Sequence, residues 1–427
     1  MTSLLHRMDL NTGERNAFRL HTIYMAIEGV VLGVLALNEF VFIKSLHGSN
    51  YQLGFLFQFS MVVFLFLVFV NEFLKRVKNR KKLLRTVAVL TRLPLLLVFF
   101  FPHSQEEMLS GNYYHYIYLG IFMVYFFGNI FINPNINYLL KTNYRHEHFG
   151  KLYSYATSLN KIVMLVVTFT YGYLLDFDNF AFVYVLPVVG VLGVVSVFFL
   201  SGIDYPEGNV IRPKQTIFQS VKRSVMEMKQ ILVSNVPYRH FELSFMLYGF
   251  SFMISVTVIT IYFYEHLNLN YASVAFYRNA YNILAIVLLP VFGKMLGNMD
   301  PRKFAVITYA SIAFYIFFLM MTTYFPYSFE VWDITFYYTL IFYVIFHGVF
   351  AATMVLLWNI GSAYFCKSEE AGTYQSLHLS LTGARAVVAP LFGVAFYEMF
   401  GFTMTFSLAI VSLLVAMGLM VWSYRYE

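Results

Sequence analysis

The sequence predicts an all-α, polytopic membrane protein with twelve transmembrane helices arranged as two six-helix pseudo-repeat bundles. Composition is the first of three observations behind this prediction. Of the 427 residues, 59% are hydrophobic and 12% are charged, whereas soluble domains carry about 25% charged residues. The other two observations are the number of long apolar stretches and the one-sided placement of the cations. This composition excludes a soluble enzyme, a nucleic-acid-binding protein and a disordered scaffold. The single cysteine, Cys366, excludes a disulfide framework.

Twelve stretches are long and apolar enough to cross a bilayer, which takes about 20 residues for each helix. The first of them is longer than the apolar core of a signal peptide, so we expect it to remain as a permanent helix. In chain order the predicted spans are 20–44, 51–73, 84–101, 113–139, 150–175, 180–201, 239–264, 271–293, 303–325, 333–365, 371–397 and 402–424.

The cations predict the orientation of these spans, because cytoplasmic loops of membrane proteins are enriched in Lys and Arg. With the amino terminus inside, the outer loops hold only Lys44 of the 29 Lys and Arg residues. Four more, Arg92, Lys161, Arg278 and Arg385, lie within predicted spans, and the others fall on the cytoplasmic side. A missed or invented span would invert this pattern. We therefore expect a multi-pass protein of the cell (inner) membrane with both termini in the cytoplasm.

The longest polar connection, 202–238, separates an amino-terminal bundle, 1–201, from a carboxy-terminal bundle, 239–427. Residues 217–232 within it have the periodicity of an amphipathic helix. We expect a connector that lies at the cytoplasmic interface, and a regulatory or partner-binding helix is the alternative. Its predicted apolar face comprises Ile217, Val221, Val225, Met228 and Leu232.

Landmarks recur in the same register in the two halves. Arg80-Lys81, after the second span, and Arg302-Lys303, after the eighth, are separated by the same number of residues as Gly150 and Gly372, which open the fifth and eleventh spans. Six-helix halves in parallel repeat form a known transporter plan, in which the substrate site lies at the interface of the repeats.

This layout resembles the major facilitator superfamily over nearly the whole chain. The signature loop of that family follows the second and eighth spans. The second copy here, GKMLGNMDPRK (293–303), keeps one glycine and both basic residues, while the first copy, 70–82, keeps only the basic run. The resemblance implies transport by alternating access. The loop residues expected to act in gating are Gly293, Asp300, Arg302 and Lys303.

Charged residues inside spans are costly in a bilayer and are therefore functional candidates. At a rise of 1.5 Å per residue, Lys161 and Arg385 lie about 16 and about 21 Å from the cytoplasmic ends of their spans. Both positions are near the middle of a hydrocarbon core that is ~30 Å thick. The two residues also lie on helices that the internal repeat makes equivalent.

The sign of these charges favours an anionic substrate. Three cations lie on helices that line the cavity in the resembled fold, against one clear acid, Glu28. Unpaired buried cations are unfavourable, and a guanidinium suits a carboxylate or phosphate. We expect an anion-binding cavity between the halves; the alternative is that the cations form structural ion pairs. The predicted substrate-binding residues are Lys161, Arg385, Arg278, Asn282, Asn129, His347, Trp358 and His378.

Glu28 is the predicted proton carrier, because a carboxyl group in a partly desolvated site can load and unload a proton. The alternative is a permanent salt bridge with a neighbouring cation. Arg92, on the third span, is expected to form an internal pair or to reach the interface.

The predicted function is therefore secondary active transport of a small or amphipathic organic anion, with protons as a candidate coupling ion. One alternative is an exporter of hydrophobic drugs or lipids, and another is a membrane receptor that transports nothing. Phosphate-binding loops and clusters with metal-ligand spacing are absent from the sequence, so we expect neither an enzyme nor a cofactor nor a metal site. The expected partners are the substrate and the lipid bilayer, without nucleic acid, and the expected state is a monomer.

Overall fold

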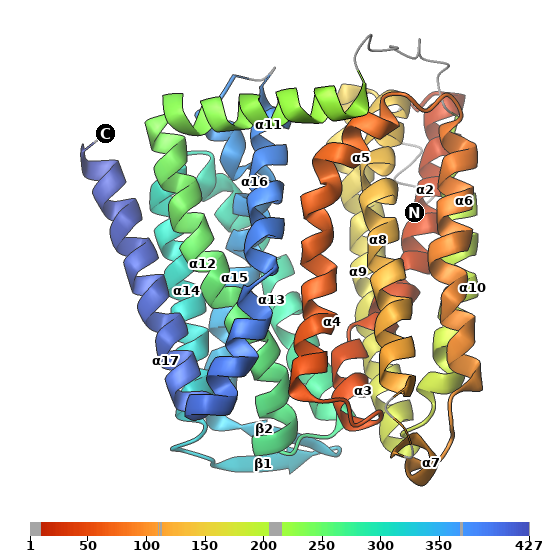
Figure 1. The fold of residues 1–427 in the computed structure, drawn as a ribbon, viewed down its shortest axis with the longest axis vertical. Coiled ribbons are helices and arrows are strands. Elements are labelled where there is room, and N and C mark those ends of the chain that lie inside the picture. Colours follow the sequence, from red (N-terminus) through yellow and green to blue (C-terminus); the bar gives the residue numbers. More distant parts are fainter. Residues whose placement is uncertain (1–9, 110, 112, 205–215, 368–369, 427) are drawn as a thin grey trace. The chain divides into compact units, whose positions relative to one another are not determined.

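The structure is a computed structural model that describes residues 10–109, 111, 113–204, 216–367 and 370–426 (Figure 1). Within these ranges, eleven helices are long and apolar enough to cross a membrane. Their contacts divide the chain into two compact units. Unit 1 comprises Met1–Val41 and Phe69–Thr216, and unit 2 comprises Phe42–Val68 and Ile217–Glu427.

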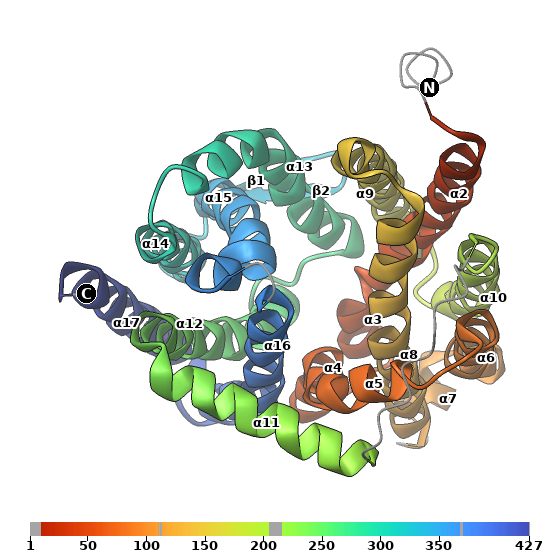
Figure 2. The same ribbon diagram turned by 90° about the horizontal axis from the view of Figure 1, so that it is seen from above.

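Unit 1 is built from antiparallel helices with short connections (Figures 1 and 2). Helix α3, Asn38–Lys44, continues the first span into unit 2. The elements of unit 1 are α2 (Thr12–Leu35), α5 (Leu67–Leu74, which begins in unit 2), α6 (Arg80–Arg92), η2 (Leu93–Phe100), α7 (Gln105–Leu109), α8 (Tyr113–Asn143), α9 (His146–Phe177) and α10 (Phe182–Leu200).

A capping box explains why the first helix starts earlier than the apolar pattern predicts. The Asn11 side chain accepts a hydrogen bond from the Glu14 amide at 2.7 Å, and the Glu14 carboxylate accepts one from the Asn11 amide at 3.4 Å. This reciprocal pair satisfies two amides that a helix start leaves unpaired. The helix therefore begins at Thr12 rather than at residue 20.

Two glycines let α2 and α9 pack closely. A Cβ atom at Gly29 would lie 2.8 Å from the carbonyl oxygen of Asn160, and one at Gly33 would lie 2.8 Å from Cβ of Val167. Small residues four apart place the close approach on one face of the helix, as in many membrane-helix pairs. The third span changes from α-helix to 3₁₀ helix at Leu93, next to Pro94, which lacks an amide hydrogen.

Unit 2 holds the spans of the second half together with the outer part of the second span. Its elements are α4 (Asn50–Val62), η1 (Val63–Phe66), α11 (Ile217–Ser234), α12 (Val236–Ile261), η3 (Tyr262–His266), α13 (Tyr271–Leu296), α14 (Pro301–Met321), β1 (Ser328–Val331), β2 (Ile334–Tyr337), α15 (Tyr338–Ile360), η4 (Gly361–Phe365), α16 (Ala371–Ala386) and α17 (Ala389–Tyr426).

A β-hairpin replaces the predicted start of the tenth span. Strands β1 and β2 pair antiparallel, with Val331 opposite Ile334. The turn residues Trp332 and Asp333 both have positive φ, 50° and 58°, which is the geometry of a two-residue hairpin turn. The prediction that this span begins at 333 was wrong, because the apolar residues of β2 continue the hydropathy of α15 without sharing its conformation.

The last two predicted spans lie in α16 and α17, and α17 is interrupted at Gly401, whose φ is 77° and ψ is 180°. This backbone conformation favours glycine because other residues place a Cβ atom in conflict with the chain. The break lies between the predicted eleventh and twelfth spans, 371–397 and 402–424.

Residues 42–68 are tied into unit 2 by hydrogen bonds. The amide nitrogen of the Asn50 side chain donates to Glu265 at 3.1 Å and to Glu398 at 2.7 Å. Further along α4, Gln58 donates to the carbonyl oxygen of Val387 at 2.5 Å. This grouping by contacts is separate from the repeat halves, 1–201 and 239–427, which stay a prediction from the sequence.

Candidate functional site

The acid and one cation of unit 1 form a buried ion pair. Nη1 of Arg92 lies 2.5 Å from Oε1 of Glu28, and both side chains are less than 10% exposed. Ser196 donates to the same carboxylate oxygen at 2.5 Å, and Nη1 of Arg92 also donates to the carbonyl oxygen of Gly193 at 3.0 Å. Three helices, α2, α6 and α10, therefore meet at one charge-assisted network. Arg92 has the internal partner that the sequence suggests for it.

Lys161 has a different environment in the same unit. It lies on α9 and is half-buried, and its ammonium has no ion pair or hydrogen bond with the residues that the structure describes. Its neighbour Asn160 is buried and donates to the carbonyl oxygen of Met25 at 2.8 Å, which fixes this face of α9 against α2. Lys161 is thus an intramembrane cation whose charge the described part of the protein does not neutralise.

Arg385 is the corresponding cation of unit 2, and it is buried to 7% exposure on α16. Its Nη1 donates to the carbonyl oxygen of Phe245 at 2.6 Å, and its guanidinium carbon lies 5.6 Å from the Phe245 ring centroid and 5.9 Å from that of Tyr248. Within the described ranges, its Nε has no acceptor and no carboxylate is within ion-pair distance.

A glycine makes room for this guanidinium. A Cβ atom at Gly249 would lie 1.8 Å from the guanidinium carbon of Arg385, so any larger residue on α12 would displace it. The guanidinium therefore lies directly against the backbone of α12, between two aromatic rings. Aromatic faces attract cations but carry no full counter-charge.

A carboxylate–imidazole pair includes His378, which lies about two turns before Arg385 along α16. Nδ1 of His378 is 3.0 and 3.2 Å from the two carboxylate oxygens of Glu242, and both residues are at most 3% exposed. The His378 ring also packs edge-on against Phe245 at 4.4 Å and Trp358 at 5.1 Å. Two predicted site residues, His378 and Trp358, are therefore brought together around Phe245, which Arg385 also contacts.

A second cluster of predicted residues lies on α13 and α15. The His347 ring is stacked between Tyr281, at 3.7 Å, and Tyr315, at 4.4 Å, with interplanar angles of 7° and 17°. Arg278 donates to the hydroxyl group of Thr260 at 3.4 Å. The Asn282 side chain donates to the carbonyl oxygen of Arg278 at 2.7 Å, which engages it with its own helix. Asn129 is half-buried on α8 in unit 1.

The predicted gating loop forms a compact helix start. Asp300 caps α14 by accepting from the Arg302 amide at 2.8 Å, and its carboxylate binds the Arg302 guanidinium at 3.1 Å through two nitrogens. Nη1 of Arg302 donates to the carbonyl oxygen of Ser423 at 3.0 Å, and the Lys303 ammonium lies 4.0 Å from the Tyr424 ring centroid. The loop is thereby attached to the end of α17. Gly293 has open space where a Cβ atom would lie.

Sequence reasoning missed two buried carboxylate partnerships. Glu242 is not among the predicted site residues, and its pairing with His378 joins α12 to α16. Glu14 accepts from Nε of Arg145 at 2.8 Å and lies 3.2 Å from Nδ1 of His148, joining the start of α2 to the start of α9. For Glu14, the capping pattern Asn11-x-x-Glu14 in the sequence indicates a structural role at a helix start.

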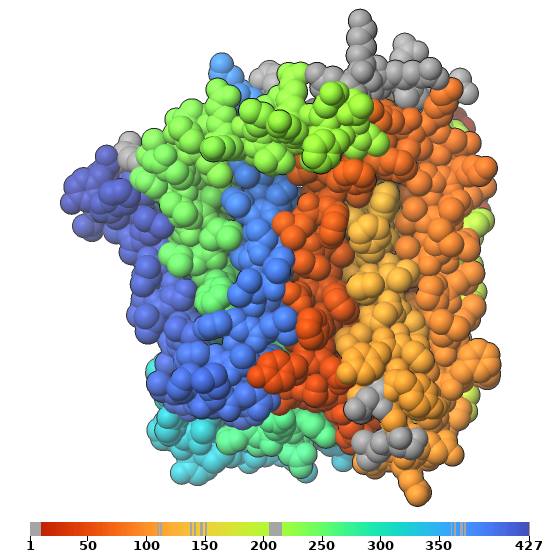
Figure 3. All heavy atoms as spheres, viewed as in Figure 1, coloured from red at the N-terminus to blue at the C-terminus, as the bar shows by residue number. Residues whose placement is uncertain are grey.

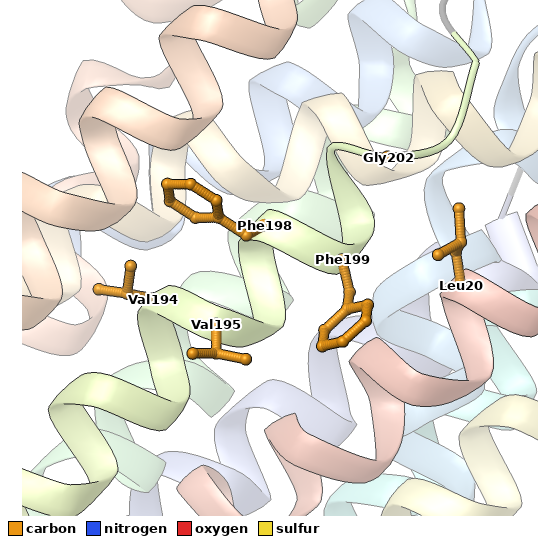
Figure 4. A pocket seen from close by; sticks show the side chains of 6 residues that line it. All are labelled: Leu20, Val194, Val195, Phe198, Phe199 and Gly202. Carbon is orange, nitrogen blue, oxygen red and sulfur yellow. The ribbon is translucent and has the colours of Figure 1, made fainter.

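An apolar groove of about 450 Å³ lies on unit 1, and none of the predicted site residues lines it (Figure 4). Its lining carries no titratable side chain, so it offers nothing that would recognise a charged substrate. The lining residues are Leu20, Val194, Val195, Phe198, Phe199 and Gly202.

These observations define a multi-pass membrane protein with ionisable groups buried between its helices. A sequence profile described as Major Facilitator Superfamily matches residues 22–336 and 243–427. The chain therefore belongs to the major facilitator superfamily and is a secondary transporter, which confirms the predicted family and the expectation that it is not an enzyme. No curated protein sequence matches the chain.

Solved transporter structures share the fold. A mutant of the nucleoside transporter NupG is 10% identical with a TM-score of 0.69, covering 96% of this chain and 99% of that chain. A structure from work on substrate recognition in proton dependent oligopeptide transporters is 12% identical with a TM-score of 0.66, covering 97% and 100%. The inward-open xylose transporter XylE from E. coli is 14% identical with a TM-score of 0.59, covering 94% of each chain. The predicted all-α polytopic fold is confirmed.

Proposed function

We propose that the protein transports a small or amphipathic organic anion across the cell membrane by alternating access, and that Lys161 and Arg385 bind this anion. The environment of Arg385 carries the proposal. Its guanidinium is buried beside two aromatic rings with Nε unbonded among the described residues. A carboxylate or phosphate group on the substrate would supply the missing acceptor and a counter-charge in direct contact, whereas Glu242 acts on Arg385 only from beyond ion-pair distance.

The contrast with Arg92 supports this assignment. Arg92 is as deeply buried, and Glu28 neutralises it at 2.5 Å. A buried ion that lacks such compensation costs several kcal/mol, since desolvation is not offset by a partner. The chain therefore pairs one intramembrane arginine internally and leaves the other available, which is the arrangement expected when the second partner is a ligand. Arg278, Asn282, Asn129, His347, Trp358 and His378 complete the proposed set of substrate-binding residues.

Proton coupling has two candidate carboxylates. Glu28 is the one that the sequence suggests, and a proton arriving there would release Arg92 from its ion pair. Glu242 is the one that the structure adds, because it shares a hydrogen bond with His378, and an imidazole next to a carboxylate can pass a proton to it or take one from it. Arg385 lies further along the same helix as His378. Protonation of this pair would therefore change the charge around the proposed anion-binding arginine.

We also propose that both termini face the cytoplasm and that the protein works as a monomer whose repeat halves, 1–201 and 239–427, move about the substrate. The distribution of Lys and Arg supports the orientation, because the predicted outer loops hold only Lys44. The loop with Gly293, Asp300, Arg302 and Lys303 would then act at the cytoplasmic ends of α13 and α14. Its attachment to α17 supports a role in movements of that end.

The experiment that tests the proposal is a ligand screen followed by transport. Purified protein is heated with anionic, neutral and cationic metabolites, and a bound ligand raises the apparent melting temperature. Anions that stabilise the protein are then assayed for uptake into proteoliposomes. Selective stabilisation by cations or by neutral hydrophobic compounds would contradict the anion proposal and favour a drug or lipid exporter. Binding without uptake in correctly inserted protein would indicate a receptor.

A further inference from the structure

Helix α11 has three faces that meet different surroundings. It lies crosswise to the spans of unit 2 and packs on α12 and α16 (Figures 1 and 2). The face toward these helices buries Met228 and Ser220 and half-buries Val221. This is the apolar face that the sequence predicts, with the exception of Val225, which is 53% exposed.

A second face of α11 is apolar and exposed, and we call it the basic-apolar face. Its four large apolar side chains are 53–78% exposed; Phe218, the adjacent pair Val225 and Met226, and Val233 follow one another at about two helical turns. Two exposed lysines, each four residues from an apolar member, lie among them. The basic-apolar face comprises Phe218, Lys222, Val225, Met226, Lys229 and Val233.

The third face of α11 is polar. Gln219, Arg223, Glu227 and Gln230 are all exposed, and Nε of Arg223 lies 2.9 Å from the Glu227 carboxylate. This face has the composition of a water-exposed helix surface, where ion pairs four residues apart are common. Its presence shows that the apolar residues of α11 are not spread evenly but are confined to particular sides of the helix.

A helix at a membrane surface meets three surroundings, namely protein, lipid and water, and three faces of different composition suit such a position. Single exposed apolar side chains are common at water-facing surfaces, but Phe218, at 78% exposure, and Val233, at 64%, share one face of α11 with Val225 and Met226, and such a patch marks an interaction surface. A helix at the edge of a bilayer buries such residues in the boundary between headgroups and acyl chains, while lysines extend their ammonium groups to the phosphates. Figure 3 shows the atoms of α11 as a light-green band at the top of the view.

We propose that the basic-apolar face of α11 binds anionic phospholipid at the membrane surface. Its apolar side chains enter the edge of the leaflet, and Lys222 and Lys229 contact the lipid phosphates. The lipid class follows from these two lysines, because attraction to anionic headgroups adds about 1 kcal/mol for each basic residue near the surface, or about fivefold in affinity. With the proposed orientation, the leaflet is the cytoplasmic one. This inference is independent of the transported substrate.

The test uses the full-length protein carrying Val225→Trp, reconstituted in vesicles with the same lipids in both leaflets. Both sets of vesicles are mainly phosphatidylcholine; one set contains added phosphatidylcholine with brominated acyl chains, and the other contains the same mole fraction of phosphatidylglycerol with brominated acyl chains. We expect quenching of the introduced tryptophan by brominated lipid, above the signal of the parent protein. We also expect brominated phosphatidylglycerol to quench more than brominated phosphatidylcholine at the same mole fraction.

Two charge variants, each combined with Val225→Trp, test whether the lysines cause the preference for phosphatidylglycerol. Lys229→Gln should reduce the preference for phosphatidylglycerol about fivefold, and Lys222→Gln should do the same. Arg223→Gln, on the polar face, is the matched control and should leave the preference unchanged. Because these side chains are exposed, all variants should keep the parent melting temperature. Quenching by aqueous iodide instead of brominated lipid would overturn the proposal and favour a soluble protein partner. Equal quenching by the two lipids would also overturn it.

Discussion

Neutralising Arg385 should remove affinity for the anionic substrate without unfolding the protein. In Arg385→Gln, the bound anion loses a charge-assisted hydrogen bond, and the charge that is removed has no carboxylate partner among the described residues. A hydrogen bond to a charged group is worth roughly 1.5–3 kcal/mol, which corresponds to a loss of about 10- to 150-fold in affinity. Lys161→Met should act in the same direction, because the Lys161 ammonium is also unpaired in the described part of the chain.

The assay is calorimetric titration of the purified variants with the anion found in the screen. Arg385→Lys is the matched control, since it keeps the charge, and it should retain part of the affinity. Apo-state melting temperatures should fall little for Arg385→Gln, because relief of an unpaired buried charge offsets lost packing. Parent-like affinity in both Arg385→Gln and Lys161→Met would refute the anion-site reasoning. A large drop in apo stability with Arg385→Gln would instead show that this arginine is a structural residue.

Three further predictions concern coupling, packing and topology. If Glu28 carries the proton, Glu28→Gln should abolish pH-driven accumulation in proteoliposomes and spare substrate exchange. If Glu242 carries the proton, Glu242→Gln should give this result in the same assay. Equal loss of both activities would indicate a structural role for the altered residue. Gly249→Ala should weaken anion binding in calorimetry at least tenfold, because the new Cβ atom displaces the guanidinium; unchanged affinity would contradict the geometry. A reporter fused within 102–112 should be external and one within 202–238 cytoplasmic, and the reverse result would disprove the twelve-span orientation.

The fold could be predicted because hydropathy and charge act over whole spans. Twenty apolar residues identify a membrane helix whatever its neighbours are, whereas the two halves that the repeat register predicts stay a prediction. Turns and strands that interrupt an apolar stretch could not be predicted in the same way. The apolar residues of β2 read as part of a span, and only the dihedral angles of Trp332 and Asp333 reveal a hairpin.

The partners of buried charges could not be predicted from spacing, because they depend on how each helix is rotated against its neighbours. The sequence showed that Glu28 and Arg92 lie within spans but not that they face each other at 2.5 Å. It placed His378 among the site candidates and left Glu242 out, since an acid near a helix end normally reaches water or loop cations. Their pairing requires the packing of α12 on α16, which no periodicity encodes.

Hydrogen bonds made by residues 42–68 have a kinetic consequence for a protein that must change shape. Lys44 donates to the carbonyl oxygen of Leu269 at 3.4 Å, and Ser45 bonds the hydroxyl group of Tyr271. Asn50 donates to the carboxylates of Glu265 and Glu398. Together, these hydrogen bonds join the end of the first span and the loop after it to the second half of the chain. If the repeat halves separate next to these residues, the hydrogen bonds of Lys44, Ser45 and Asn50 have to break in the same movement. The free energy of these hydrogen bonds then adds to the activation barrier. A substitution at Asn50 would therefore change the rate of exchange between conformations and leave the substrate-binding residues unaltered.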